Sequence, residues 1–317
     1  MTSPLRQRIV SGSRIIHRVN FDSLKQCAAW AGDDSGKRWS INVSHTQSSE
    51  HTRFTGSKSF AHAMSMVERG WAEGRQKLVK NVEHLSLQKD LRNIPSFLYD
   101  VGGARPEVPL AVAGDPCCMW NANPAQQAKA PVLRFIISGT ANCSWSADAM
   151  IRWGSCILSV VDSLENSGQC SIELSLFIGV KDYRDNRRLE FTTCLKEAGS
   201  HIDFDVMAFA LAHPSMFRRI GFGCMERVHE DDMEDAMSMG YGQPSEMEQE
   251  DKELNGAHYV PGIGKCGIER ELLESSGNEK ELFGKVMEGF QRLVDGKSFA
   301  EDKKKEKPFD IDDFRYF

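Results

Sequence analysis

Residues 131–168 constrain the fold of this chain more than any other stretch. Val132–Ile137 is a nearly continuous apolar run, which is typical of a central strand covered on both faces. A polar turn follows, and then a long segment with apolar side chains at helical spacing that ends before Gly168. A buried strand, a turn and a helix in this order predict an α/β protein with its ligand site at the turn.

The patterns that follow predict more elements of the same layer structure. Residues 172–180 and 189–195 are interpreted as a hairpin, because Asp182–Asn186 between them has the composition of a turn. Asp203 or Asp205 is expected to cap the next helix. The remaining elements predicted from periodicity are a helix after a Ser59 cap, strands at 97–101 and 220–224, and a last helix at 279–295.

Composition divides the chain into four parts. The N-terminal part is polar and mildly basic, and its short alternations at 15–19 and 39–43 are either edge strands or pieces of a loosely attached arm. The four parts are an arm (1–55), a helical region with a connecting segment (56–130), an α/β core with an acidic, solvated loop at 226–256 (131–296), and a flexible tail (297–317).

Length and charge exclude several classes of protein. With 317 residues, 40% of them hydrophobic, the chain can bury a sizeable core, and its net charge of -6 gives no global attraction for nucleic acid. Nine cysteines without a repeating frame indicate reduced thiols. No apolar run approaches the roughly 20 residues that cross a bilayer, and no signal-peptide pattern is present. We therefore expect a cytoplasmic protein without a membrane anchor.

The order of elements over residues 131–225 resembles a von Willebrand A-type domain. The resemblance implies a three-layer open sheet, mostly parallel with a short antiparallel edge strand, with helices on both faces. In that family the first turn carries Asp-x-Ser-x-Ser, which binds a divalent cation and, through it, an acidic group of a partner. Carboxylate and hydroxyl oxygens suit a hard cation such as magnesium.

The corresponding turn departs from the family pattern in this chain. Ser138 stands at the aspartate position, while Thr140 keeps a hydroxyl and Asn142 a carbonyl oxygen. Asp205, or Asp203, stands where the resemblance implies a later ligand. Since the anionic ligand of the turn is missing, we expect a degenerate ion site with no bound cofactor. A magnesium ion held by Ser138, Thr140, Asn142 and Asp205 is the alternative.

A second resemblance concerns three segments with no assigned chemistry. The sequences SFAHAMSMVERGWAEG, YDVGGARPEVPLAVAGDP and ALAHPSMFRR are similar to uncharacterised proteins of tailed phages and mobile elements. This resemblance implies a phage or mobile-element setting, and hence the host cytoplasm, but no reaction.

Two further motifs favour structural explanations. Gly262–Gly267 matches G-x-G-x-x-G, but Pro261 precedes it where a dinucleotide site needs a central strand, so the glycines are expected to form a turn. Cys117–Cys118 has no partner cysteines or histidines at ligand spacing. G-x-S-x-G, H-E-x-x-H and Walker A motifs are absent from the sequence.

The candidate partner-binding residues are aromatic or paired basic side chains. Arg218 and Arg219 are expected to hold a phosphate or a carboxylate, or else to bridge the acidic loop on the surface. Trp145 lies in the turn, and Phe314 and Phe317 belong to an acidic-aromatic tail that is either a docking peptide or a disordered end.

The leading hypothesis is a non-enzymatic adaptor that binds a protein partner through the 138–145 turn. One alternative is a phage nucleic-acid-binding accessory protein in replication or transcription, in which the basic arm, Trp30, Trp39 and the arginine pair contact single-stranded DNA. The other is an enzyme with an unfamiliar site. A small-molecule ligand and a membrane partner are not expected.

Overall fold

The computed structural model describes residues 3–33, 43–74, 97–100, 105–106, 108–122, 131–166, 170–182, 186–228, 241–248 and 256–300. Most of the alternation at 39–43, the glycine at 168 that was expected to end the helix, and the tail after residue 300 lie outside these residues. No helix in the described part of the chain is long and apolar enough to cross a bilayer.

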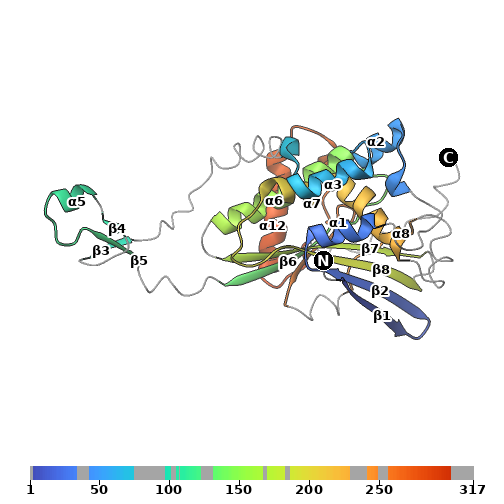
Figure 1. The fold of residues 1–317 in the computed structure, drawn as a ribbon, viewed down its shortest axis with the longest axis horizontal. Coiled ribbons are helices and arrows are strands. Elements are labelled where there is room, and N and C mark those ends of the chain that lie inside the picture. Colours follow the sequence, from blue (N-terminus) through green and yellow to red (C-terminus); the bar gives the residue numbers. More distant parts are fainter. Residues whose placement is uncertain are drawn as a thin grey trace.

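The described residues form one large mixed sheet (Figure 1). Six strands lie in the order β1-β2-β8-β7-β6-β10, and β9 pairs with β7. The bounds are β1 Leu5–Ser11, β2 Arg14–Phe21, β6 Val132–Ser138, β7 Ser171–Lys181, β8 Arg187–Lys196, β9 Gln243–Pro244 and β10 His258–Val260. The predicted strand after the β6–helix unit and its hairpin partner are therefore confirmed as β7 and β8.

The sheet combines parallel and antiparallel strand pairs. The β2–β8, β6–β7 and β6–β10 pairs are parallel, whereas β1–β2, β7–β8 and β7–β9 are antiparallel. The antiparallel strand β8 was expected at the sheet edge, but β2 and β1 continue the sheet beyond it. Residues 15–19 are thus a strand of the sheet, as one interpretation of this alternation predicted, but the strand is internal, between β1 and β8, and not at the edge.

The described helices that pack on this sheet lie on one of its faces, and α5 lies apart beside β3, β4 and β5 (Figure 1). The three-layer arrangement required helices on both faces, and its second helical layer is not found among the described residues. The principal helices are α1 Leu24–Gly32, α2 Ser49–Thr55, α3 Phe60–Arg69, α6 Ala147–Asn166, α7 Phe204–Ala212, α8 Phe222–Arg227, α11 Arg270–Glu274 and α12 Glu279–Val294.

Burial along β7 differs between the two faces of the sheet. Alternate residues from Ile172 to Val180 are all buried under the helices, while Ser171, Glu173 and Ser175 on the opposite face are half-buried. Farther along that opposite face Phe177 is buried and packs on Tyr259 with ring centroids 6.0 Å apart. The same face also carries ion pairs, such as Arg18 Nη2 to Glu190 Oε2 at 2.8 Å.

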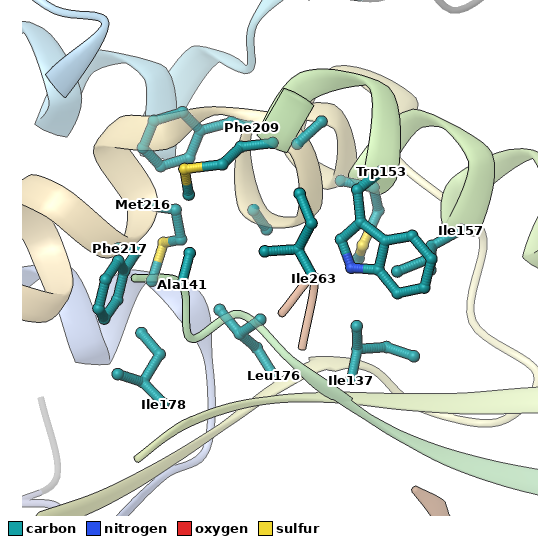
Figure 2. Close-up of a cluster of buried hydrophobic side chains, with 14 of the residues drawn as sticks. Ile137, Ala141, Trp153, Ile157, Leu176, Ile178, Phe209, Met216, Phe217 and Ile263 are labelled. Atoms are coloured by element: carbon teal, nitrogen blue, oxygen red, sulfur yellow. The ribbon is translucent and has the colours of Figure 1, made fainter. Parts of the chain in front are cut away.

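The core between sheet and helices is apolar and continuous (Figure 2). Ile137 of β6 and Leu176 of β7 point toward Trp153 and Ile157 of α6, and Ile263 enters from the loop after β10. Phe290 of α12 packs on Phe135 with ring centroids 4.9 Å apart. The other labelled members are Ala141, Ile178, Phe209, Met216 and Phe217.

The segment at 220–224 is helical, which corrects its prediction as a strand. Met216–Gly221 forms a π-helical turn that continues directly into α8. Its residues are buried on every side, so their apolar run shows no helical period and resembles a strand. The fourth strand of the core is instead β10, a three-residue strand parallel to β6.

Helix caps and smaller elements follow the local sequence. Ser59 caps α3 by accepting a hydrogen bond from His62 N, and Asp203 rather than Asp205 caps α7.

Residues near 100 form a separate small sheet in the order β3-β5-β4. Its strands are β3 Phe97–Asp100, β4 Arg105–Pro106 and β5 Met119–Ala122, and the short helix α5, Val108–Val112, lies between β4 and β5 in the chain. Val43–His45 is a 3-10 turn, η1.

We expect Gly154→Ala to lower the free energy of unfolding by about 2–3 kcal/mol. A Cβ at Gly154 of α6 would lie 2.0 Å from Leu211 O and 2.4 Å from Ala212 Cα of α7, so the two helices would have to separate. Urea unfolding followed by circular dichroism measures the change.

Gly284→Ala in α12 is the matched control. No atom lies within 4 Å of a Cβ at Gly284, so alanine should raise stability by about 0.5–1 kcal/mol through helix propensity. Equal effects of the two alanines would contradict the close α6–α7 approach.

Candidate functional site

The turn after β6 lies where the carboxyl ends of β6, β7 and β10 meet. Residues 139–146 connect β6 to α6, and Ser146 Oγ accepts a hydrogen bond from Ala149 N at 3.0 Å. Ser146 Oγ also donates to Glu274 Oε2 of α11 at 2.5 Å. The turn is therefore fixed at its helical end by a cap and by a second element.

The hydroxyl side chains expected to bind a cation point into the protein. Ser138 and Thr140 are both buried, and Thr140 Oγ1 accepts a hydrogen bond from Gly179 N of β7 at 2.9 Å. Gly139 N donates to Phe177 O at 2.8 Å. These contacts hold the turn against β7.

Glu246 supplies a carboxylate beside this turn. Tyr259 of β10 donates its hydroxyl to Glu246 Oε2 at 2.5 Å, and Gly262 N lies 3.3 and 3.2 Å from the two carboxylate oxygens. Burial, and then the Glu246 charge, raise the pKa of the Tyr259 phenol well above its usual value. The sequence placed Glu246 in a solvated acidic loop, and β9 instead brings it onto the sheet.

Gly262 closes the loop onto the turn. A Cβ there would lie 2.6 Å from Thr140 O and 3.1 Å from both Ser138 Oγ and Glu246 Oε1. The G-x-G-x-x-G segment does follow a sheet strand, because Pro261 comes after the last strand residue, Val260. Its first glycine serves this close packing, in agreement with the structural explanation.

The other expected ligands do not join this cluster. Asn142 Oδ1 accepts a hydrogen bond from Ser144 N at 3.0 Å within the turn, and Asp205 packs against Gly70 while its carbonyl accepts from Trp71 N. In the part of the chain that the structure describes, no three His, Cys, Asp or Glu side chains are placed to share a metal. The four residues expected to bind magnesium are therefore not gathered into one ligand set: Thr140 is bonded to β7, and Asn142 and Asp205 make contacts elsewhere.

The arginine pair is buried, which corrects its expected place on the surface. Arg218 donates to Phe54 O at 2.8 Å and to Trp145 O at 2.7 Å, and its guanidinium lies 4.1 Å from the Phe54 ring centroid. Burial lowers the pKa of Arg218 from 12.5 to about 10. Its role is to hold the turn at Trp145 from inside.

Arg219 is fully buried and binds another segment. It donates to Ser57 Oγ and Ser57 O at 3.0 and 2.8 Å, and to the carbonyls of Ser44 and Thr46 at 2.7 and 3.0 Å. Burial lowers the pKa of this guanidinium as well. Sequence periodicity does not reveal this burial, because all residues of the π-helical turn are enclosed.

What the turn offers to a partner is a small exposed rim. Trp145 is buried, and Arg270 lies over its ring at 4.7 Å while donating to Ser144 O at 2.7 Å. Gly264 approaches the same indole, since a Cβ there would be 3.3 Å from Trp145 Nε1. We call the exposed residues around the indole the rim: Asn142, Cys143, Ser144, Gly264, Lys265 and Arg270.

A second feature is an open groove of about 540 Å³ between α1, α3 and residues 45–47. His45 stacks on Phe60 there with centroids 4.3 Å apart. Behind it, Ser44 Oγ lies 2.7 Å from His45 Nδ1 and donates to Glu226 Oε2 at 2.6 Å. Ser44 is fully buried, so its hydroxyl orients the imidazole and is not placed to attack a substrate.

Trp30 and the arginine pair, three of the residues in the nucleic-acid alternative, are used internally. Trp30 packs on Phe21 and Phe191 with centroids 5.5 and 6.4 Å apart, and Arg227 covers it at 5.2 Å. Trp39, Phe314 and Phe317 lie outside the described residues. The described Trp30 and arginine pair therefore present no stacking platform.

Comparison with family models identifies a family for this chain. The model of the family described as "Domain of unknown function (DUF7192)" matches residues 12–269, which include the main sheet from β2 to β10. Neither the curated proteins nor the solved structures contain a match.

We expect Arg219→Lys to lower the free energy of unfolding by about 3 kcal/mol. A lysine cannot bond to residues 44, 46 and 57 together, so buried carbonyls lose their donors. Thermal unfolding measures the loss. Arg53→Lys on the exposed side of α2 is the control, and a comparable loss there would contradict the buried role.

Proposed function

Since this chain belongs to the DUF7192 family, whose description assigns no activity, we propose from its geometry that it is a non-enzymatic protein-interaction protein. Its core is a von Willebrand A-like sheet, and the rim around Trp145 holds an acidic group of a protein partner without a metal ion. The single observation that carries this proposal is the closed turn with two cationic side chains, Lys265 and Arg270, beside it.

Topology supports the likeness to the von Willebrand A-type domain. The chain order β6, α6, β7, β8, α7, with β8 antiparallel to β7, is the order that the resemblance implies up to the segment at 220–224, which is helical. The three-layer form remains part of the proposal, because helices on one face alone are described. A phage or mobile-element origin also remains a proposal.

The electrostatics of the rim favour an acidic ligand. Lys265 is exposed, and Arg270 has a side chain 53% exposed with its nearest carboxylate, Glu274, at 3.6 Å. Both belong to the loop and helix that follow β10, at the edge of the sheet where the family binds its partner's acidic group. In this proposal Lys265 and Arg270 pair directly with the partner's carboxylate, so that no metal ion is needed to bridge the two proteins.

The partner is tested by affinity capture with the full chain and two charge variants. Lys265→Glu/Arg270→Glu should lose at least about tenfold of the binding to a protein that the natural chain captures, because an attractive pair becomes repulsive. The captured protein is then purified, and its dissociation constant is measured for each variant.

Lys280→Glu/Lys297→Glu is the matched control, with the same charge change on exposed lysines away from the rim. The proposal fails if both double variants bind the captured protein equally. It also fails if neutralising the acidic residues of the captured protein leaves its binding unchanged.

A second measurement tests the metal-free turn. Mg²⁺ or Mn²⁺ at millimolar concentration should leave the melting temperature unchanged, because Glu246 and Thr140 are engaged in protein hydrogen bonds. Stoichiometric binding of either cation by calorimetry would refute the metal-free turn.

Glu246→Ala should lower the free energy of unfolding by about 1–3 kcal/mol, because the buried Tyr259 hydroxyl loses its acceptor.

A further inference from the structure

We infer that Cys27 of α1 and Cys224 of α8 are a redox latch, a buried thiol pair that closes to a disulfide under oxidising conditions and then fixes the two helices to each other. Their sulfur atoms lie 3.7 Å apart, although the residues are 197 positions apart in the chain. Both residues are 1% exposed. The inference does not depend on the proposed binding of a protein partner.

The two thiols meet because α1 and α8 lie side by side (Figure 1). A Cβ at Gly223 would lie 3.2 Å from both Ala31 Cβ and Ala31 O, so the glycine lets α8 come close to α1. Arg227 Nη1 lies 3.0 Å from Asp33 Oδ2, which joins the C-terminal ends of the same two helices. Since an S–S bond is about 2.05 Å long, the sulfur atoms have to approach by about 1.7 Å, a movement of side-chain size.

Closure of the latch removes two electrons and two protons from the pair. With hydrogen peroxide as the oxidant, one thiolate attacks a peroxide oxygen, the O–O bond breaks, and a sulfenic acid and hydroxide form. The second thiol attacks the sulfur of the sulfenic acid, and the S–O bond breaks as the S–S bond forms. The two thiol protons leave with the two oxygens, so two thiols and one peroxide give one disulfide and two water molecules.

Burial makes the latch slow to react while α1 and α8 are packed. Burial, and then the hydrogen bond with Cys27, raise the pKa of the Cys224 thiol well above its usual value, so the reactive thiolate is scarce. The oxidant reaches the sulfurs when the two helices part by local opening. The disulfide that forms is enclosed again, so the latch responds to sustained oxidation and not to a brief exposure.

The other buried cysteines serve as internal controls. Among the described residues, Cys27 and Cys224 are the only cysteines whose sulfurs are in hydrogen-bond contact. Cys156 and Cys266 are buried apart from other thiols, and burial raises the pKa of Cys156 to about 12 and of Cys266 to about 11. These two thiols have the burial of the latch without its partner, so they should stay reduced.

Peptide mapping of the full-length protein by mass spectrometry tests the inference. After the exposed thiols are blocked with N-ethylmaleimide, hydrogen peroxide should join Cys27 to Cys224, while Cys156 and Cys266 remain free to react with iodoacetamide after unfolding. The oxidised protein should melt at least about 3 °C higher than the reduced protein, because the bond closes a long loop in the unfolded chain. Dithiothreitol added during unfolding should remove the difference.

Cys27→Ala and Cys224→Ala should each abolish the disulfide and the rise in melting temperature, whereas Cys156→Ala, which also removes a buried thiol, should keep both. The mapping of the natural chain decides whether the bond forms even where an alanine variant fails to fold. The inference is overturned if Cys27 and Cys224 stay reduced while Cys117 and Cys143, left unblocked, are oxidised. It is also overturned if either latch cysteine pairs elsewhere, or if the bond forms without raising the melting temperature.

Discussion

Two buried guanidinium groups hold the helical layer of this protein together. Arg218 and Arg219 bond to backbone carbonyls of the segment 44–57 and of Trp145, with neutral oxygens as their acceptors. A buried cation costs free energy unless its donors are satisfied, so the loops must adopt the shape that presents those carbonyls. The position of the turn after β6 depends on this constraint, because Trp145 O is one of the acceptors.

Elements with one buried and one exposed side can be predicted from the sequence. The helix at 147–166 and the β7–β8 hairpin show apolar periods, and Ser59 and Asp203 are recognisable as caps. The strand at 132–138 is recognisable as an apolar run, although described helices cover only one face of the sheet. Complete burial removes the periodic signal. Ile220 and its neighbours are enclosed on all sides, so their helical period is invisible in the sequence.

The candidate site was predicted in position but not in composition. The turn at 138–146 stands at the carboxyl end of the parallel strands, as expected from the strand–turn–helix order. Glu246 and the Arg218 contact were missed, because both come from residues far along the chain and neither has a local pattern. Long-range pairs such as Arg219 with Ser57 are fixed by tertiary packing, so spacing in the sequence does not predict them.

The place of β2 in the sheet has a consequence for biosynthesis. Arg18 bonds to Glu190 across 172 residues of sequence, and β2 has its parallel neighbour only in β8. At ribosomal speeds of about 5–20 residues per second, the N-terminal hairpin waits roughly 10–30 s after emerging before that neighbour exists. During this interval the nascent chain exposes two strands that can pair with other chains. The yield of folded protein in a cell therefore depends on how well these strands are shielded.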